Sequence, residues 1–422
     1  MKSLHGQFSQ GLDTVKNMDV SRGFSNTILS LQQNNIIVIL KDIFQRKRGS
    51  MSLKHIIIGS CLLLSQLAFG QGKGWPDYDV VVPVASNEIK IMNYNVENLF
   101  DTEHDEGKTD WEYLPIKSPL KENCKSQGPY RRSCEETNWI SSHLQAKLYQ
   151  LRGVIMSQGS LPDILTLEEV ENENIVKTMA KLLGYRYYVM TNSPDKRGID
   201  VAILFNEGKI KYINYVERRL SDSHLKSRNL LGANFSLAGS REVLGVYVNH
   251  WPSQGKPSSA RVGAAMDLRK LVDEVASYYP DNYHVVLAGD FNTIDQDKPH
   301  PFKEVIQDPK WDQRFFDAQD LFERLNLRGK VNMPLASYFY SRERTWNKLD
   351  RFFVNKTLVD GKGVEIVQEW FRVIAPKFAL YEYKSKYFPD PFYVPLRSNH
   401  NGDSPTTAGY SDHFPVVMKI RL

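Results

Sequence analysis

An apolar strand that stops at a glycine constrains this chain more than any other stretch. Residues 285–292 read VVLAGDFN, so an apolar run breaks at Gly289 and presents Asp290 and Asn292 two positions apart. A Val- and Leu-rich run of this kind is typical of a strand buried in a sheet, and the glycine indicates a tight turn at its end. Ligands bind at the carboxyl ends of strands in α/β sheets, which favours a functional role for Asp290 and Asn292, although both residue types also occur in plain turns.

Other apolar segments of the chain end in polar residues in the same way. We expect strands at residues 88–92, 164–167, 185–190, 201–205, 243–248, 337–340, 351–354 and 415–420. Apolar residues at helical spacing predict helices over residues 138–156, 175–183 and 260–276. Strands interspersed with helices indicate an α/β fold. The polar residues at the strand ends are Asn95, Glu169, Asp200, His250, Asp290, Asn292, Asp350, Asp412 and His413.

Each of these residues also has a structural interpretation. Asp200 could pair with Arg197, His250 could pack beside Trp251, and Glu169 could be a solvated residue at a helix start. A whole set of polar residues that follow apolar runs is better explained by one shared site.

The chemistry of the set indicates a hard divalent cation. It supplies carboxylate and amide oxygens and two histidines but no thiolate, which suits Mg²⁺, with Mn²⁺ or Ca²⁺ as alternatives. Together these groups provide the parts for phosphodiester hydrolysis, because one can activate water, one can support the leaving oxygen, and the cation neutralises charge. The sequence has no GxxxxGK[ST], GxSxG or HExxH motif and no GxGxxG after a strand, which argues against the common nucleotide-binding, α/β-hydrolase and zinc-protease classes.

The first seventy residues differ from the rest of the chain. Residues 51–70 begin with Met51, continue through a short basic segment into an apolar run, and end in small residues, which is typical of a signal peptide. We therefore interpret residues 1–50 as an upstream extension and residues 71–422 as the mature domain, exported to the periplasm or beyond. The alternative is a cytoplasmic N-terminus with a membrane anchor.

The net charge gives no support for a nucleic-acid partner. Residues 1–70 contain eight Lys or Arg and three Asp, so their net charge of +5 equals that of the whole chain, and residues 71–422 are neutral. Beyond the signal peptide only Cys124 and Cys134 remain. In an exported protein they could form a disulfide, and the alternative is two free thiols; a zinc site is not expected, since no second Cys or His pair lies nearby.

Seven segments in order resemble the endonuclease/exonuclease/phosphatase superfamily over residues 88–421. They are NYNVENLF, DILTLEEVEN, RGIDVAILF, VNHWPS, LAGDFN, LDRFFVN and SDHFPV. The resemblance implies a four-layered α/β sandwich, with two packed mixed β-sheets flanked by helices. One departure is Glu168, which stands where many members have glutamine.

The resemblance also implies residue roles. Asn95 and Glu169 look like the principal metal ligands, with Asp412 as a further ligand. His250 looks like the histidine that contacts the phosphate or leaving group, oriented by Asp200. His413, oriented by Asp350, or alternatively Asp290, looks like the general base, and Asp290 with Asn292 would position the attacking water.

The resulting functional hypothesis is an exported, metal-dependent nuclease that acts as a monomer on DNA or RNA, without a stable protein partner. The segments NYNVENLF and VNHWPS are most similar to bacterial extracellular deoxyribonucleases. A phosphatase or lipid phosphodiesterase acting on sphingomyelin or an inositol phosphate is the alternative on the same fold. A carbohydrate- or protein-binding module without activity is a third possibility, disfavoured because every expected catalytic position is filled.

Overall fold

Two large β-sheets are built from strands taken from the whole length of the described chain. The structure, a computed structural model, describes residues 81–222, 227–311, 314–327, 331–385, 388–404 and 406–422. The predicted upstream extension and signal peptide, residues 1–70, lie outside the described residues.

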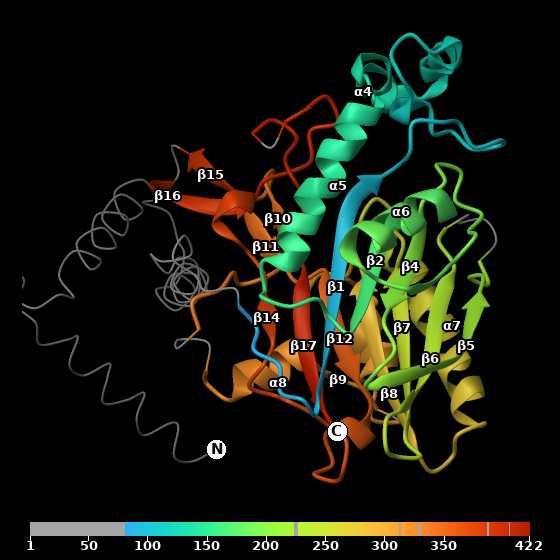
Figure 1. The fold of residues 1–422 in the computed structure, drawn as a ribbon, viewed down its shortest axis with the longest axis vertical. Coiled ribbons are helices and arrows are strands. Elements are labelled where there is room, and N and C mark those ends of the chain that lie inside the picture. Colours follow the sequence, from blue (N-terminus) through green and yellow to red (C-terminus); the bar gives the residue numbers. More distant parts are fainter. Residues whose placement is uncertain (1–80, 223–226, 312–313, 328–330, 386–387, 405) are drawn as a thin grey trace, which may run out of the picture. The chain divides into compact units, whose positions relative to one another are not determined.

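The first sheet has the strand order β13-β17-β1-β2-β4-β3, and β14 also pairs with β17. Its strands are β1 (Glu88–Leu99), β2 (Ile164–Val170), β3 (Tyr187–Met190), β4 (Asp200–Phe205), β13 (Glu365–Ile366), β14 (Arg372–Val373) and β17 (Val416–Arg421). Because β1 runs parallel to β2 and antiparallel to β17, the sheet is mixed. The earliest described strand, β1, thus lies beside the last, β17 (Figure 1).

The second sheet has the strand order β5-β6-β7-β8-β12-β9. Its strands are β5 (Ile210–Arg218), β6 (Leu230–Leu237), β7 (Val243–His250), β8 (Tyr283–Asp290), β9 (Phe316–Asp317) and β12 (Asp350–Val354). The apolar run at residue 285 is the middle of β8, which lies parallel to β7 and antiparallel to β12.

The two sheets pack face to face and helices cover their outer faces. Ile91 and Ile203 of the first sheet share one apolar core with Val246 and Val286 of the second. Successive strand residues point to opposite faces, so Met92 lies in a different core, formed with the helices on the outside of the first sheet.

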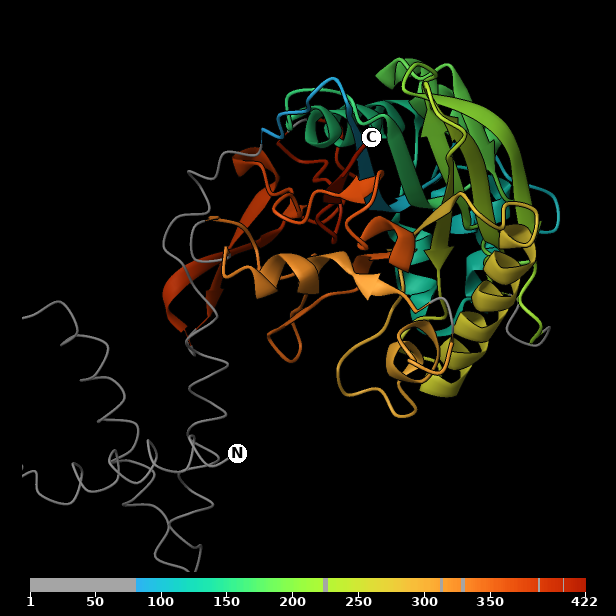
Figure 2. The same ribbon diagram turned by 90° about the horizontal axis from the view of Figure 1, so that it is seen from below.

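The covering helices on the first sheet are α5 (Ser141–Met156) and α6 (Glu173–Leu183), and α7 (Ser258–Ala276) covers the second. Figures 1 and 2 show α5 and α6 on one side of the paired sheets and α7 on the other. The predicted four-layered α/β sandwich is therefore confirmed.

The remaining elements lie outside the two sheets. They are the hairpin of β10 (Tyr338–Tyr340) and β11 (Thr345–Asn347), the hairpin of β15 (Leu380–Ser385) and β16 (Phe388–Pro395), and helices α4 (Arg131–Glu136) and α8 (Ala318–Arg324). Among the described residues, no helix is both long and apolar enough to span a membrane.

The long excursion between β1 and α5 is tied internally. Cys124 and Cys134 form a disulfide with their Cα atoms 5.5 Å apart, which confirms the predicted bond. The ammonium group of Lys121 donates to the carbonyls of Glu112, Cys134 and Thr137 at 2.9, 2.8 and 2.7 Å. The excursion is thus a fixed structure instead of an open loop.

Several strands continue further than the apolar pattern predicts. β1 was expected to end at residue 92 but runs to Leu99, because its backbone keeps pairing with β2, with Asn93 opposite Thr166 and Asn95 opposite Glu168. The sheets bury these polar residues, so alternation of polarity alone does not mark the strand ends. Six of the predicted site residues lie within strands, namely Asn95, Glu169, Asp200, His250, Asp290 and Asp350, whereas Asn292 follows β8 and Asp412 and His413 precede β17.

Candidate active site

Neighbouring strands of the second sheet bring three predicted site residues together. In the parallel pair β7 and β8, His250 lies opposite Asp290, and in the antiparallel pair β8 and β12, Asp350 also lies opposite Asp290. Gly289 permits this close approach: it has φ +143°, and a Cβ there would lie 2.1 Å from the carbonyl oxygen of Asn249. A side chain at residue 289 would therefore separate the strands that align the site.

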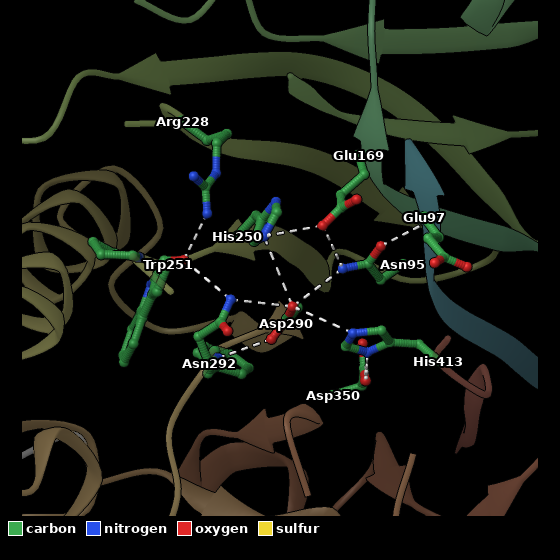
Figure 3. Close-up of polar contacts among 12 residues, drawn as sticks. Asn95, Glu97, Glu169, Arg228, His250, Trp251, Asp290, Asn292, Asp350 and His413 are labelled. Atoms are coloured by element: carbon green, nitrogen blue, oxygen red, sulfur yellow. Dashed lines mark hydrogen bonds and ion pairs between the residues drawn. The ribbon is translucent and has the colours of Figure 1, made fainter. Parts of the chain in front are cut away.

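The first sheet supplies the facing residues. The β1–β2 ladder shifts register after Asn95, and Glu169 has φ +64°, which turns its side chain out of the regular strand alternation. The Asn95 amide then donates through Nδ2 to Glu169 Oε1 at 3.3 Å and to Asp290 Oδ2 at 3.1 Å. Asn95 thus links the two sheets, and the site lies where their strand ends meet (Figure 3).

Four side chains surround one oxygen of Asp290. Its Oδ2 accepts from Nδ2 of Asn95 and from Nδ2 of Asn292 at 3.2 Å, and it lies 3.8 Å from Nε2 of His250 and 3.9 Å from Nε2 of His413. Burial raises the pKa of Asp290 to about 7, with a further contribution from Asp350, while His413 opposes the rise. The two histidines that lie 163 positions apart in sequence therefore face one carboxylate (Figure 3).

His413 is held by a carboxylate as predicted. Its Nδ1 lies 2.6 Å from Oδ2 of Asp350, and its backbone amide donates to the hydroxyl of Ser411. That hydroxyl in turn donates to the carbonyl of Asn95 at 2.7 Å. Burial alone would lower the pKa of His413, but the charge and hydrogen bond of Asp350 raise it well above its ordinary value.

His250 is not held by Asp200, which corrects the predicted pairing. Asp200 Oδ1 accepts from the Thr191 hydroxyl at 2.5 Å and from the Ser193 amide at 2.8 Å. Thr191 follows β3 and lies beside the start of β4, because its amide donates to the carbonyl of Val201. This position brings its hydroxyl next to the Asp200 carboxylate. Within the described residues Nδ1 of His250 has no hydrogen-bond partner.

The electrostatic surroundings of the two histidines also differ. Burial, followed by the nearby charges of Arg228 and Arg197, lowers the pKa of His250 well below its ordinary value. His250 is therefore a neutral imidazole. His413, surrounded by carboxylates, is favoured as an imidazolium. The Arg197 guanidinium lies 3.7 Å from the Asp195 carboxylate, and the described residues contain no ion pair between Arg197 and Asp200.

The predicted metal ligands are close to one another but do not yet form a coordination sphere. Among the described residues, no group of three or more His, Cys, Asp or Glu side chains is arranged to hold a metal ion. Asn95 presents Nδ2 to the carboxylates while its Oδ1 accepts from the Glu97 amide at 3.0 Å, so oxygen ligation requires its amide to turn over.

The donor set nevertheless fits a divalent cation. The side chains of Glu169 and Asp412 are each 18% exposed, so both carboxylates remain accessible from solvent. The charge of Glu169 contributes to raising the pKa of Asp290 and that of Asp412, after burial as the main cause. This concentration of negative charge on oxygen donors is what Mg²⁺, Mn²⁺ or Ca²⁺ neutralises.

Sequence reasoning missed several residues at this site. Arg228 donates to the carbonyl of Trp251 at 2.7 Å, and the same carbonyl accepts from Asn292. The ring of Tyr338 lies 4.8 Å from the ring of His413. Arg397 contacts Asp412, with 3.2 Å between Nη2 and Oδ2. Arg228, Tyr338 and Arg397 lie outside the seven resembling segments, so the sequence carried no signal for these three residues.

Glu97 was also missed, although it lies within NYNVENLF. It is buried, and its φ of +51° places it in the left-handed region together with Asn98, Glu169 and Asn292. Backbone strain of this kind costs on the order of 1–3 kcal/mol per residue and concentrates at functional sites. Glu168, which stands where many members of the resembling superfamily have glutamine, is fully buried. Both its carboxylate oxygens lack a hydrogen-bond partner within the described residues.

The chain is similar to one protein family and to several solved structures. A sequence profile of the endonuclease/exonuclease/phosphatase family matches residues 90–422. No curated protein matches the sequence. Similar solved structures include truncated TDP2 from Caenorhabditis elegans, with 15% identity and a TM-score of 0.45 over 79% of this chain and 98% of that chain. A mannosyl-6-phosphatase from Bacteroides thetaiotaomicron has 15% identity and a TM-score of 0.47 over 79% of this chain and 100% of that chain. The human nocturnin catalytic domain has 16% identity and a TM-score of 0.45 over 79% of this chain and 94% of that chain.

The family profile spans every residue assigned to the site, from Asn95 to His413. Members of this family hydrolyse phosphoester bonds, generally with a divalent metal. This chain belongs to the endonuclease/exonuclease/phosphatase family and is a phosphoester hydrolase.

Proposed function

We propose that this chain is an exported, divalent-metal-dependent nuclease that hydrolyses phosphodiester bonds of DNA or RNA. The observation that carries the proposal is the convergence on Asp290: Nε2 of His250 and Nε2 of His413 lie within 4 Å of the same carboxylate oxygen, beside Asn95 and Glu169. Two imidazoles on either side of one carboxylate can contact a phosphoryl group from two directions.

The two histidines differ in what they can do. His413 lies among Asp290, Asp350 and Asp412, at 3.9, 2.6 and 3.9 Å, and three carboxylates favour its imidazolium form. It therefore donates to a phosphate oxygen, and it is a poor base. His250 is neutral and can donate one proton to a phosphate oxygen or leaving group.

Asp290 is then the better candidate for the base that accepts the proton of the attacking water. Asn292 fixes this carboxylate twice, through its backbone amide at 2.8 Å to Oδ1 and through its side chain to Oδ2. A bound divalent cation would be held by Glu169, Asp412 and Asn95, and would neutralise charge that develops on the phosphate oxygens.

Nucleic acid is favoured as the substrate by the similarity of NYNVENLF and VNHWPS to bacterial extracellular deoxyribonucleases. Export is favoured by the predicted signal peptide at residues 51–70, and the Cys124–Cys134 disulfide supports an oxidising compartment. VNHWPS itself is held in shape by the buried Arg261, whose Nη1 donates to the carbonyls of Pro252 and Ser253 while its other nitrogens pair with Asp297.

The test is to incubate the purified protein in parallel with supercoiled plasmid, sphingomyelin vesicles and an inositol phosphate, each with Mg²⁺ or EDTA. We expect plasmid nicking that requires the metal and is lost in His413→Ala. A matched control is His284→Ala, since His284 is a buried histidine at the opposite end of β8 that pairs with Glu242 at 3.1 Å.

The other outcomes are also decisive. Intact plasmid beside metal-dependent release of product from sphingomyelin or the inositol phosphate would contradict the nuclease proposal and favour a lipid phosphodiesterase or phosphatase. Nicking that survives in His413→Ala would contradict the proposed site.

A further inference from the structure

A loop that precedes the last motif carries an arginine to the edge of the active site. The two ends of this loop, whose described residues are 396–404 and 406–410, meet where the Tyr410 amide donates to the carbonyl of Leu396 at 2.9 Å. Gly409 has φ +63°, and a Cβ there would lie 1.8 Å from the carbonyl oxygen of Arg397. The chain therefore crosses itself where Gly409, three residues before Asp412, meets the backbone of Arg397.

Glu97 anchors this loop to the first sheet. Its Oε1 accepts from Nε and Nη2 of Arg397 at 3.0 and 2.9 Å, and its Oε2 accepts from the backbone amide of Ser398 at 2.7 Å. The buried Lys147 donates to the Glu97 carbonyl and to the Ser398 hydroxyl at 2.6 and 2.7 Å. The position of the guanidinium is thus set by groups on β1 and α5.

Arg397 nevertheless keeps 68% of its side chain exposed. Its Nη2 also lies 3.2 Å from Oδ2 of Asp412, whereas Nη1 has no partner among the described residues. Glu97 is only 7% exposed, so the arginine neutralises a buried carboxylate, yet more than half of its own side chain still faces solvent. A guanidinium fixed in advance loses little entropy when it binds an anion, and its planar fork matches phosphate oxygens.

The position of Arg397 separates it from the reacting centre. Asp412 faces Nε2 of His413 with Oδ1 and faces Arg397 with Oδ2. The Asp412 carboxylate thus lies between the arginine and the histidine. An anion bound there is the neighbour of the group that is hydrolysed.

We propose that Arg397 binds the phosphate next to the scissile phosphodiester, which makes it a specificity residue for a nucleic-acid strand. The inference rests on the proposed nuclease function and adds to it the requirement for a second anionic linkage. A substrate with a single phosphoester group would leave Arg397 without its ligand.

The test uses three trinucleotides with the full-length protein and Mg²⁺. One has two phosphodiester linkages, and each of the others has one linkage replaced by a neutral methylphosphonate, which leaves a single cleavable bond with an uncharged neighbour. For the wild-type protein we expect kcat/KM to fall about tenfold on one of the two substituted trinucleotides, the size of effect that one charge-assisted contact produces. We expect Arg397→Ala to lose this discrimination, and Arg397→Lys to keep part of it because it retains the charge.

Arg218→Ala is the matched control, because Arg218 also pairs with a glutamate, but this pair joins Arg218 on β5 to Glu274 on α7. Arg218→Ala should show the same fall in kcat/KM on the substituted trinucleotide as the wild-type protein. Wild-type cleavage that is indifferent to both substitutions, or an Arg397→Ala variant that discriminates as well as the wild type, would overturn the inference and leave the nuclease function intact. Failure of the wild-type protein to cleave any of the trinucleotides would contradict the nuclease function and this inference together.

Discussion

The imidazole of His413 and the carboxylate of Asp350 lie 2.6 Å apart although the two residues are 63 positions apart in sequence. Asp350 begins β12 and is buried, and its own backbone amide donates to the Ser337 hydroxyl at 3.2 Å. Ser337 also pairs with the segment that carries His413, since the Phe414 amide donates to its carbonyl. One serine thus fixes both partners of the pair.

Asp350→Asn should therefore lower kcat more than it raises KM. The substitution keeps the shape of the side chain but removes the charge that favours the imidazolium of His413, and an outer carboxylate of this kind typically contributes about 10- to 100-fold to activity. Steady-state kinetics on a nicked-plasmid or oligonucleotide assay would measure the split. Asp360→Asn, an exposed aspartate after β12, is the control. A variant with unchanged kcat would contradict the role of Asp350.

Asp200→Asn should leave kcat close to that of the wild type, because Asp200 contacts Thr191 and Ser193 instead of His250. A loss of kcat equal to that of Asp350→Asn would show that Asp200 acts on His250 after all. Circular dichroism of both variants separates a loss of activity from a loss of folded protein.

Asp200 should also affect stability in a pH-dependent way. Burial raises its pKa to about 6, so between about pH 4 and pH 6 the folded chain keeps a proton that the unfolded chain has released. Its contribution to the free energy of unfolding therefore falls as the pH rises through this window. Asp200→Asn cannot ionise and so escapes this loss. The free energy of unfolding of the variant, relative to that of the wild type, should therefore rise by up to about 3 kcal/mol from pH 4 to pH 6. Urea unfolding at both pH values measures the difference, and an equal difference at both would contradict the shifted pKa.

The layers of the fold could be predicted from sequence because buried strands and amphipathic helices leave periodic apolar patterns. The ends of the strands could not, since Asn93, Asn95 and Glu168 are polar yet fully buried between the sheets. Their burial depends on partners supplied by other strands, such as Asp350 for Asn93 and Asp290 for Asn95. The polarity of neighbouring residues in the sequence does not reveal such partners from distant strands.

Some residues of the candidate site could likewise be predicted from the sequence, and others could not. The motif residues on adjacent strands, such as His250 and Asp290, could be placed because strand ends gather at one edge of a sheet. Arg397 could not be predicted, because a loop without periodicity brings it to Asp412. The predicted Asp200–His250 pairing was wrong because Thr191, which follows β3 beside the start of β4, forms a hydrogen bond to the Asp200 carboxylate.

Glu169→Gln should weaken binding of Mg²⁺ without unfolding the protein. The carboxylate is partly exposed, and its Oε2 accepts from the backbone amide of Asn98 at 3.0 Å, a contact that an uncharged isostere can keep. A ligand present at 100 times its Kd stabilises a protein by about 2.7 kcal/mol. Thermal unfolding with increasing Mg²⁺ should therefore raise the Tm of the wild type and of Glu173→Gln, an exposed glutamate at the start of α6. An equal rise in Glu169→Gln would remove Glu169 from the ligand set.

Replacing both cysteines by serine should destabilise the excursion between β1 and α5 and leave the catalytic chemistry in place. Cys124 and Cys134 are separated by 10 positions, and a closed loop of this size contributes about 3 kcal/mol by restricting the unfolded chain. Lys121→Met should act on the same segment, because it leaves three carbonyls without their donor, at about 1–3 kcal/mol if they stay buried. Lys125→Met is the control, since Lys125 is exposed and forms a surface pair with Glu122. Urea unfolding should show both losses, while kcat at 25 °C stays near the wild-type value; a fall in kcat with unchanged stability would show instead that the excursion contacts the substrate.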